Sequence, residues 1–535
     1  MNTRTRTDVL LLVAFCGFLF FYGLGAFGLL GADEPRYAQV AREMLDRHDW
    51  ITPTLQGKPW LEKPVLYYWQ AIISYSIFGV SDCAARMPAA FDTALMIAAI
   101  FFFLRRFRPG SETDGALITA ACAGIIGFAR GASTDMPLSA MFAIALLGWF
   151  AWYEGRKRNG LIVFYFFLAL ATLAKGPVAI FFAGAILFIF IAIKRDWKAI
   201  LGSLWVPGIL IFLAVASPWY AAVQSRNPEF FRVFILEHNL GRFGQDLYHH
   251  RQPFWFYLPV LLLALMPWTL WLILAVAERL RVTMSATERK LSLATHAGSW
   301  QLFLLIWLLL PVLFFSASQS KLPGYILPAI PAGALLVTEY LRNLQSENKR
   351  LPISLVSLHS ILCGLLVFAA LAAPGIQLHH RLTAGMGTYV AAVVAVLVMI
   401  GIAAAIVRMG IAILRPATML PIVIGVAALL KLAAPAVDAT QSARPVAQVL
   451  QGFSHEAFPV ALFHTNRQLE YGLEFYLNRP AGRYENGEVP REGHVLVSNQ
   501  NASDYFSDLL PGRKVSFLTS VPAQKLDLFW VGPAN

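Results

Sequence analysis

The chain has 535 residues, of which 57% are hydrophobic and only 14% are charged. This balance excludes a soluble protein of this size, which could not cover its surface with polar groups. The formal charge of +12 does not indicate nucleic-acid binding, because the basic residues are spread over short loops between apolar runs. The sequence therefore predicts a polytopic α-helical membrane protein.

Apolar runs of roughly 18–22 residues, long enough to cross a hydrocarbon core of about 30 Å, recur along the chain. About thirteen spans are expected. The first is too long for a signal peptide and is expected to be retained. The runs lie near residues 8–30, 87–104, 115–132, 137–153, 161–175, 177–193, 200–219, 256–276, 300–317, 323–340, 353–373, 388–407 and 417–434.

Basic residues occupy every second gap between these runs, which the positive-inside rule assigns to the cytoplasm. The span count and the charges agree on a cytoplasmic N-terminus and an external C-terminus. The four cysteines show neither a disulfide framework nor a metal signature. The basic clusters begin at Arg4, Arg105, Arg156, Lys194, Arg279, Arg342 and Arg408.

Residues 1–434 are predicted to form the membrane domain, with external loops at 31–86 and 220–255. The first loop contains "DEPRYAQVAREMLDRHDW" and "PWLEKPVLYYWQAIISYSIFG". Both are interpreted as amphipathic helices at the membrane interface, with an aromatic belt that includes Tyr67, Tyr68 and Trp69.

Residues 435–535 are less hydrophobic and are predicted to form a small external α/β domain. Short apolar runs, "PVALFHT", "HVLVSN", "KVSFL" and "LDLFWVG", are strand candidates, and "NRQLEYGLEFYLN" is a helix candidate. This segment carries no recognisable functional motif.

A charged residue at the centre of a membrane helix raises the free energy of insertion by roughly 2.5–3.5 kcal/mol. Charged residues close to the spans are therefore candidates for a structural or functional role. Asp33 and Asp135 each precede a proline and could be helix N-caps. Glu62 and Lys63 could be a solvated surface pair, and His238 could be a structural histidine. Alternatively, lysines and arginines on the external side could hold a lipid phosphate. A carboxylate beside them could orient or activate an acceptor, and a carboxylate with a histidine could hold a divalent metal.

The motifs "GADEPRYAQVAREML", "GKPWLEKPVLYYW", "STDMPL", "AKGP", "EHNLGRF", "PFWFYLP" and "KLPGYILP" resemble those of the lipid A aminoarabinose transferases. These belong with the protein O-mannosyltransferases among membrane glycosyltransferases of the C-type fold. The resemblance covers nearly the whole membrane part. It implies an inverting transfer of 4-amino-4-deoxy-L-arabinose from undecaprenyl phosphate to a lipid A phosphate. This modification lowers affinity for polymyxin-like peptides.

The resemblance also implies roles for individual residues. Asp33 and Asp135 would be the catalytic carboxylates, and Glu62 with His238 a metal site. The metal at this site would be zinc or magnesium, and no other cofactor is expected. A monomer in the bacterial inner membrane is expected, with its site on the periplasmic face. Lys63, Arg242 and Arg36 would bind the lipid phosphate, and Tyr37, Lys175, Tyr220, Lys321 and Tyr325 would line the sugar and acceptor cavities.

Two alternatives stay open. The same fold could move another sugar, such as galactosamine or mannose, from a polyprenyl phosphate to a glycolipid or a protein. A transporter is disfavoured, because the hydropathy shows no inverted repeat and the charges gather on one side.

Overall fold

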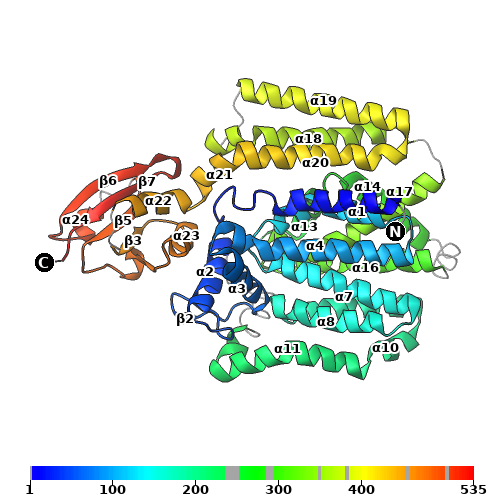
Figure 1. Cartoon of the computed structure of the whole chain (residues 1–535), viewed down its shortest axis with the longest axis horizontal. Coiled ribbons are helices and arrows are strands. Elements are labelled where there is room, and N and C mark those ends of the chain that lie inside the picture. Colours follow the sequence, from blue (N-terminus) through cyan, green and yellow to red (C-terminus); the bar gives the residue numbers. More distant parts are fainter. Residues whose placement is uncertain are drawn as a thin grey trace.

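The computed structural model describes residues 3–234, 252–284, 295–347, 351–379, 385–453, 458–500 and 505–534. Figure 1 shows a bundle of roughly parallel helices with a β-sheet beyond one of its ends. Helices α2 (Asp33–Asp46) and α3 (Leu66–Phe78) lie between the two parts. The chain ends lie at opposite ends of the long axis. The orientation in a membrane stays a prediction.

The described residues contain eight helices that are long and apolar enough to span a membrane, or up to ten with two bent pairs. Three shorter apolar helices accompany them: Thr7–Phe21, α8 (Asn159–Lys175) and α9 (Val178–Lys194). A polytopic helical protein is confirmed, whereas the count of thirteen stays a prediction. The eight are α4 (Asp82–Phe107), α7 (Asp135–Gly155), α11 (Val206–Arg226), α16 (His296–Ala317), Pro323–Ser346 with α17 (Ile330–Ser346), α18 (Ile353–His379), α19 (Met386–Met409) and Ile411–Gln441 with α20 (Leu414–Ala428).

Each bent pair corresponds to one predicted run, 115–132 or 256–276, although the helices extend beyond the bounds of that run. Helix α5 (Glu112–Ala120) meets α6 (Ala123–Ala129) at 66°. The second pair, Phe254–Ala264 and Thr269–Arg281, meets at 118° and includes α13 (Tyr257–Ala264) and α14 (Thr269–Met284). The run near 200–219 is divided between α10 (Trp197–Ser203) and α11.

The first helical segment, formed by α1 (Thr3–Cys16) and η1 (Gly17–Phe21), ends well before residue 30. Tyr22 is extended and Gly23 has a φ of +67°, a conformation that glycine adopts readily. The prediction of a continuous span to residue 30 is therefore wrong at its end. The remaining residues form the approach to α2.

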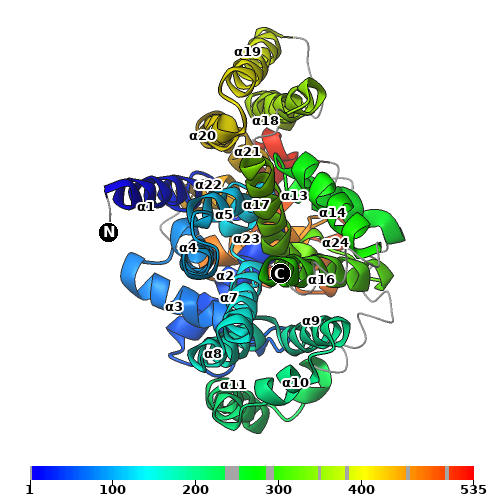
Figure 2. The ribbon, with the colours of Figure 1, turned by 90° about the vertical axis from the view of Figure 1, so that its right-hand side faces the viewer.

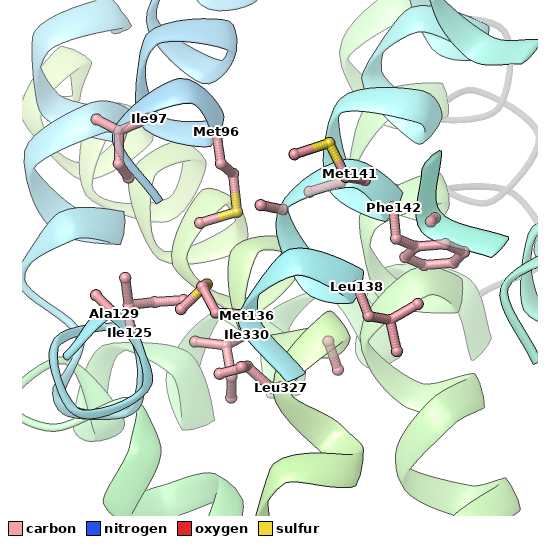
Figure 3. Close-up of a cluster of buried hydrophobic side chains, with 14 of the residues drawn as sticks. Met96, Ile97, Ile125, Ala129, Met136, Leu138, Met141, Phe142, Leu327 and Ile330 are labelled. Carbon is pink, nitrogen blue, oxygen red and sulfur yellow. The ribbon is translucent and has the colours of Figure 1, made fainter. Parts of the chain in front are cut away.

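Helix α7 lies at the centre of the membrane part, and 89% of its most apolar 18-residue stretch is buried. In Figure 2 it stands among α4, α8 and α16. Met136 and Leu138 lie in the first turn of α7 and belong to a buried cluster with Leu327 and Ile330 (Figure 3). This packing fixes the end of α7 that carries Asp135.

Helices α18, α19 and α20 form a group at one side of the bundle (Figure 2). Buried His359 of α18 links this group to α14. Trp271 Nε1 donates to His359 Nδ1 at 3.1 Å, and His359 Nε2 lies 2.9 Å from Thr418 Oγ1 of α20. Because Nδ1 of His359 accepts the hydrogen bond from Trp271, the neutral imidazole of His359 carries its proton on Nε2. The contacts satisfy polar groups where water is scarce.

The prediction of an interfacial aromatic belt in α3 is wrong for two of its residues. Tyr67 and Tyr68 are fully buried. Tyr67 donates to the Ala85 carbonyl at 2.8 Å. The exposed side chains of α3 include Ile73 and Ile77, so apolar residues occupy both faces and the helix is not amphipathic. A packed neighbour, α4, overrides the interfacial preference of the tyrosines.

Residues 460–531 hold a five-stranded sheet in the order β4-β3-β5-β7-β6. β3 pairs in parallel with β4 and β5, whereas β7 pairs antiparallel with β5 and β6. The four predicted strands and the predicted helix are confirmed, and β4 was not predicted. The elements are β3 (Val460–Phe463), α23 (Arg467–Leu477), β4 (Ala481–Arg483), β5 (His494–Asn499), β6 (Val515–Val521) and β7 (Leu526–Val531).

Polar contacts join the sheet-bearing segment to the membrane part. Arg444 of α22 (Arg444–Gly452) pairs with Asp82 at 3.0 Å and with Asp438 at 2.7 Å. Tyr476 of α23 donates to Asp82 at 2.6 Å and accepts from the Leu29 amide at 2.8 Å. These contacts hold α22 and α23 against α4 and the segment that precedes α2, and α23 also packs on α2 itself.

Candidate active site

A cavity of about 910 Å³ lies at the junction of the membrane part and the sheet-bearing segment. Its walls come from both parts of the chain, and most of its lining residues are polar or charged. The membrane part contributes Ala32, Asp33, Arg36, Tyr37, Trp60, Glu62, Lys63, Thr134, Asp135, Lys175, Ser320, Leu322 and Tyr325. The C-terminal segment contributes Thr465, Asn466, Arg467, Glu470, Tyr471, Arg483, Glu485, Asn486.

The first turn of α2 forms one wall. Asp33 is the first residue of the helix, and Ala32 is its N-cap. Its side chain is 57% exposed and pairs with Arg36, one turn later. The N-cap interpretation of Asp33 is therefore wrong, because the spacing of three residues favours the ion pair on the helix surface. The carboxylate lines the cavity, where it can meet a substrate.

The Arg36 guanidinium is enclosed by aromatic rings. Its Cζ lies 5.2 Å from the ring centroid of Tyr37, 5.1 Å from Trp60 and 5.7 Å from Tyr471. The side chain is only 14% exposed. Cation–π attraction to several rings stabilises a charge in such a place.

Asp135 and Lys175 form a second ion pair in the cavity. Asp135 begins α7 and Lys175 ends α8, where Gly176 adopts a φ of +87° and stops the helix. Thr134 is the N-cap of α7, so the N-cap interpretation of Asp135 is wrong. Lys175 Nζ also lies 5.0 Å from the ring centroid of Tyr325. The helix ends thus juxtapose the two charges.

Gly324 permits a close approach beside this pair. A Cβ atom on Gly324 would lie 2.9 Å from the carboxylate carbon of Asp135. Only glycine lets the short helix Pro323–Ala329 (η4) pass this close to Asp135. The motif "KLPGYILP" therefore serves packing of the cavity wall as well as placing Tyr325.

The segment after strand β2 (Lys58–Pro59) brings Glu62 and Lys63 to the cavity. Lys63 has an exposed fraction of only 9%. A solvated surface pair is therefore the wrong interpretation for Lys63, because the fold covers its side chain. A largely buried ammonium at the rim of a cavity is suited to binding an anion.

Four other predicted site residues are not in this lining. Tyr220 donates to the Thr172 carbonyl at 2.9 Å. Lys321 is buried and donates to the Ser318 carbonyl at 2.5 Å, whereas its neighbours reach the cavity. A backbone carbonyl holds each of them outside the lining of this cavity, and their predicted roles in sugar and acceptor binding stay predictions. His238 and Arg242 lie outside the described residues.

A metal remains a prediction. Among the residues that the structure describes, no three His, Cys, Asp or Glu side chains are grouped closely enough to hold an ion. Glu62 lies in the cavity wall, but its predicted partner His238 is not described.

The sequence did not predict the wall that the C-terminal segment provides. Arg467, Glu470 and Tyr471 come from α23, and Arg483 and Glu485 from β4 and the turn after it. Arg483 pairs with Glu470 at 2.8 Å. No motif marks these residues, and only the docking of α23 on α2 brings them to the cavity.

Docking also buries Glu474 of α23, which accepts a hydrogen bond from Gln56. Burial raises the pKa of this carboxyl from 4.5 to about 8. The folded protein thus binds a proton that the unfolded chain releases above pH 4.5. Its free energy of unfolding should fall as pH rises through this interval, being highest below pH 4.5.

Replacement of Glu474 by glutamine is expected to remove this pH dependence. Between pH 5.5 and 8.5 the wild type should lose on the order of 2 kcal/mol that Glu474→Gln retains. Unfolding of the full chain in detergent at several pH values measures the difference. Glu492→Gln, at an exposed position of the same domain, is the matched control. Identical pH profiles for wild type and Glu474→Gln would contradict the prediction.

Comparisons with known proteins indicate the family to which this chain belongs. The dolichyl-phosphate-mannose-protein mannosyltransferase family matches residues 62–221. Undecaprenyl phosphate-alpha-4-amino-4-deoxy-L-arabinose arabinosyl transferase of Pseudomonas aeruginosa (strain UCBPP-PA14) is 31% identical over 341 residues, 63% of this chain and 59% of that protein. The protein of the same name from Pseudomonas paraeruginosa (strain DSM 24068 / PA7) is 31% identical over 381 residues, 70% of this chain and 66% of that protein. The matches thus span about three fifths to two thirds of these relatives.

The fold extends the similarity to the whole chain. The crystal structure of ArnT from Cupriavidus metallidurans bound to undecaprenyl phosphate has a TM-score of 0.76 at 22% identity and covers 98% of this chain and 97% of that chain. The archaeal oligosaccharyltransferase AglB from Archaeoglobus fulgidus has a TM-score of 0.50 at 12% identity, over 95% of this chain and 71% of that chain.

A helical membrane bundle with a charged cavity at one end is the architecture of the C-type membrane glycosyltransferases, and this chain has it. Within that class, the chain belongs to the ArnT-like glycosyltransferases. The predicted family and the polytopic helical fold of the C type are confirmed, whereas the helix count and the periplasmic placement of the C-terminal segment stay predictions.

Proposed function

We propose that this protein transfers 4-amino-4-deoxy-L-arabinose from undecaprenyl phosphate to a phosphate group of lipid A. The names of its relatives and the lipid bound to ArnT support this donor. The observation that carries the proposal is the single cavity in which Asp33, Arg36, Lys63, Asp135 and Lys175 meet. The reaction would occur at the periplasmic face of a Gram-negative inner membrane, in a monomer whose N-terminus is cytoplasmic.

The proposed reaction is one displacement at the anomeric carbon. An oxygen of the acceptor phosphate forms a bond to this carbon, and the bond from the carbon to the donor phosphate oxygen breaks. The bonding electrons leave with undecaprenyl phosphate, and the configuration inverts. Because the acceptor is already anionic, no strong base is required. Arg36 and Lys63 would stabilise the departing phosphate, and Asp33 would stabilise positive charge on the sugar.

A second candidate follows from the mannosyltransferase family match over residues 62–221. In that case the donor would carry another sugar, such as mannose, and the acceptor would be a hydroxyl group. A hydroxyl acceptor must lose a proton, so Asp33 would act as a general base. The two candidates thus differ in acceptor and in the role of one carboxylate.

Mass spectrometry of lipid A tests the main proposal. The protein would be expressed in a polymyxin-sensitive strain that makes the aminoarabinose donor but lacks its own transferase. A pentosamine-sized addition to lipid A, with increased polymyxin resistance, is the expected result. Unmodified lipid A, with the protein shown to be inserted, would contradict the proposal and favour the second candidate.

Lys63→Ala is expected to weaken binding of undecaprenyl phosphate about 10- to 100-fold, the effect of losing one charge-assisted hydrogen bond. Titration of the purified protein in detergent with undecaprenyl phosphate measures the affinity. Lys58→Ala is the matched control, because Lys58 is exposed in the hairpin before the cavity segment. Equal affinities of wild type and Lys63→Ala would remove Lys63 from the donor site.

A further inference from the structure

The C-terminal segment reaches the active-site cavity through α23, which packs along α2. Arg42 of α2 donates to the Phe475 carbonyl at 2.6 Å. About one turn earlier in α23, Tyr471 lies against Arg36, and its side chain is 8% exposed. The hydrogen bond from the Arg42 side chain to the Phe475 carbonyl lies outside the cavity and holds the two helices in register. It therefore fixes the position of the Tyr471 ring relative to α2.

Three segments far apart in the sequence enclose the Arg36 guanidinium: α2 itself, the loop that carries Trp60, and α23. Tyr37 and Trp60 belong to the membrane part, so Tyr471 supplies the ring that the membrane part lacks. A planar guanidinium confined by rings has few orientations available, and its remaining N–H groups point in fixed directions.

The hydrogen bonds of Arg36 leave donor capacity for a ligand. One terminal nitrogen, Nη2, pairs with Asp33. Nε is buried and has no hydrogen-bond acceptor among the described residues. Burial also closes Nε to a ligand. The Arg36 side chain nevertheless lines the cavity, where an anionic oxygen can accept from its terminal N–H groups.

We propose that Tyr471 is a positioning residue of the active site. Its ring holds the Arg36 guanidinium in the orientation in which Arg36 binds an oxygen of the donor lipid's phosphate. The inference rests on the proposed function for the identity of this anion. It assigns the C-terminal segment a part in donor binding, although the membrane part holds Asp33, Asp135 and both lysines of the cavity lining.

Binding of undecaprenyl phosphate to the purified full-length protein in detergent tests the proposal without any sugar transfer. Tyr471→Leu is expected to weaken binding about three- to tenfold, and Tyr471→Phe, which keeps the ring, by less than about twofold. In an Arg36→Ala background, Tyr471→Leu should cause no further loss, because the two residues act through one contact. A merely structural effect of Tyr471 would persist in that background.

Tyr476→Phe is the matched control for domain docking. Tyr476 is on the same helix, and its hydroxyl contacts Asp82 and the Leu29 amide of the membrane part. It does not line the active-site cavity. This variant should lower the unfolding temperature yet leave the affinity within about twofold of the wild type.

Three results would overturn the inference alone: unchanged affinity in Tyr471→Leu, an equal loss in the Arg36→Ala background, or an equal loss in Tyr476→Phe. A wild-type protein that does not bind undecaprenyl phosphate would contradict the proposed function, and the positioning role with it. The affinity of the wild type for undecaprenyl phosphate therefore shows whether the proposed function fails or only the positioning role of Tyr471.

Discussion

Asp33→Asn is expected to reduce sugar transfer about 100- to 1,000-fold, the effect of losing one preorganised electrostatic contact to a transition state. Asparagine has nearly the same shape but no charge, so it cannot stabilise positive charge on the sugar or act as a base. Because the side chain of Asp33 is exposed in the cavity, the substitution should change the free energy of unfolding little. Transfer is measured as the modified fraction of lipid A in membranes containing equal amounts of inserted protein.

The matched control for Asp33 is Asp46→Asn. Asp46 ends the same helix, is exposed, and accepts a hydrogen bond from Asn478 at 3.3 Å. This variant should transfer sugar at the wild-type rate. If Asp33→Asn also kept full activity, Asp33 would have no part in the mechanism, and Asp135 would be the carboxylate to test next.

The second large effect concerns stability. Arg86 of α4 is fully buried, and its guanidinium donates to the carbonyls of Leu24, Phe27 and Gly28, each at 2.8 Å. It also pairs with Glu34 at 2.7 Å. Arg86→Met is expected to lower the free energy of unfolding by about 3–5 kcal/mol, because the partner charge and the carbonyls lose their donors in a buried place.

The unfolding temperature of the purified protein in detergent measures the effect of Arg86→Met. Arg105→Met, at an exposed position near the end of the same helix, controls for the loss of a positive charge. The double variant Arg86→Met with Glu34→Met should be more stable than Arg86→Met alone, since it removes the unpaired carboxylate as well. An unfolding temperature of Arg86→Met equal to that of the Arg105→Met control would show that the pair contributes little.

The Glu34–Arg86 pair also explains part of the "GADEPRY" motif. Glu34 accepts hydrogen bonds from the Leu30 and Ala132 amides, at 2.7 and 2.8 Å. It thus ties the start of α2 to the segment that leads into α7. Asp33 and Asp135 are the first residues of these two helices. In this motif, neighbouring acids have different tasks: Glu34 holds the backbone, and Asp33 faces the cavity.

The sequence carries one signal that Arg86 is a structural residue. Arg86 directly precedes an apolar run, in a place where an unpaired charge would be expensive. Such a residue requires a partner inside the protein. Which partner it has could not be read, because Glu34 lies 52 residues earlier and the contact depends on how α2 and α4 pack.

The sequence by itself determined the class of membrane protein, most of the helices, and five of the elements in the C-terminal segment. These depend on local patterns: apolar runs of span length, and short apolar runs between turns. It also supplied Asp33, Arg36, Lys63, Asp135 and Lys175 as candidates, through motifs that each lie within a few residues.

Only the tertiary structure decided which charges pair, which side chains are buried and what closes the cavity. Tyr67 and Tyr68 are in the core and Tyr220 and Lys321 are outside the cavity lining because neighbouring helices and backbone carbonyls hold them. The ring of Tyr471 reaches Arg36 across 435 positions of sequence. Contacts of this kind depend on the packing of distant segments, and no local pattern of residues encodes them.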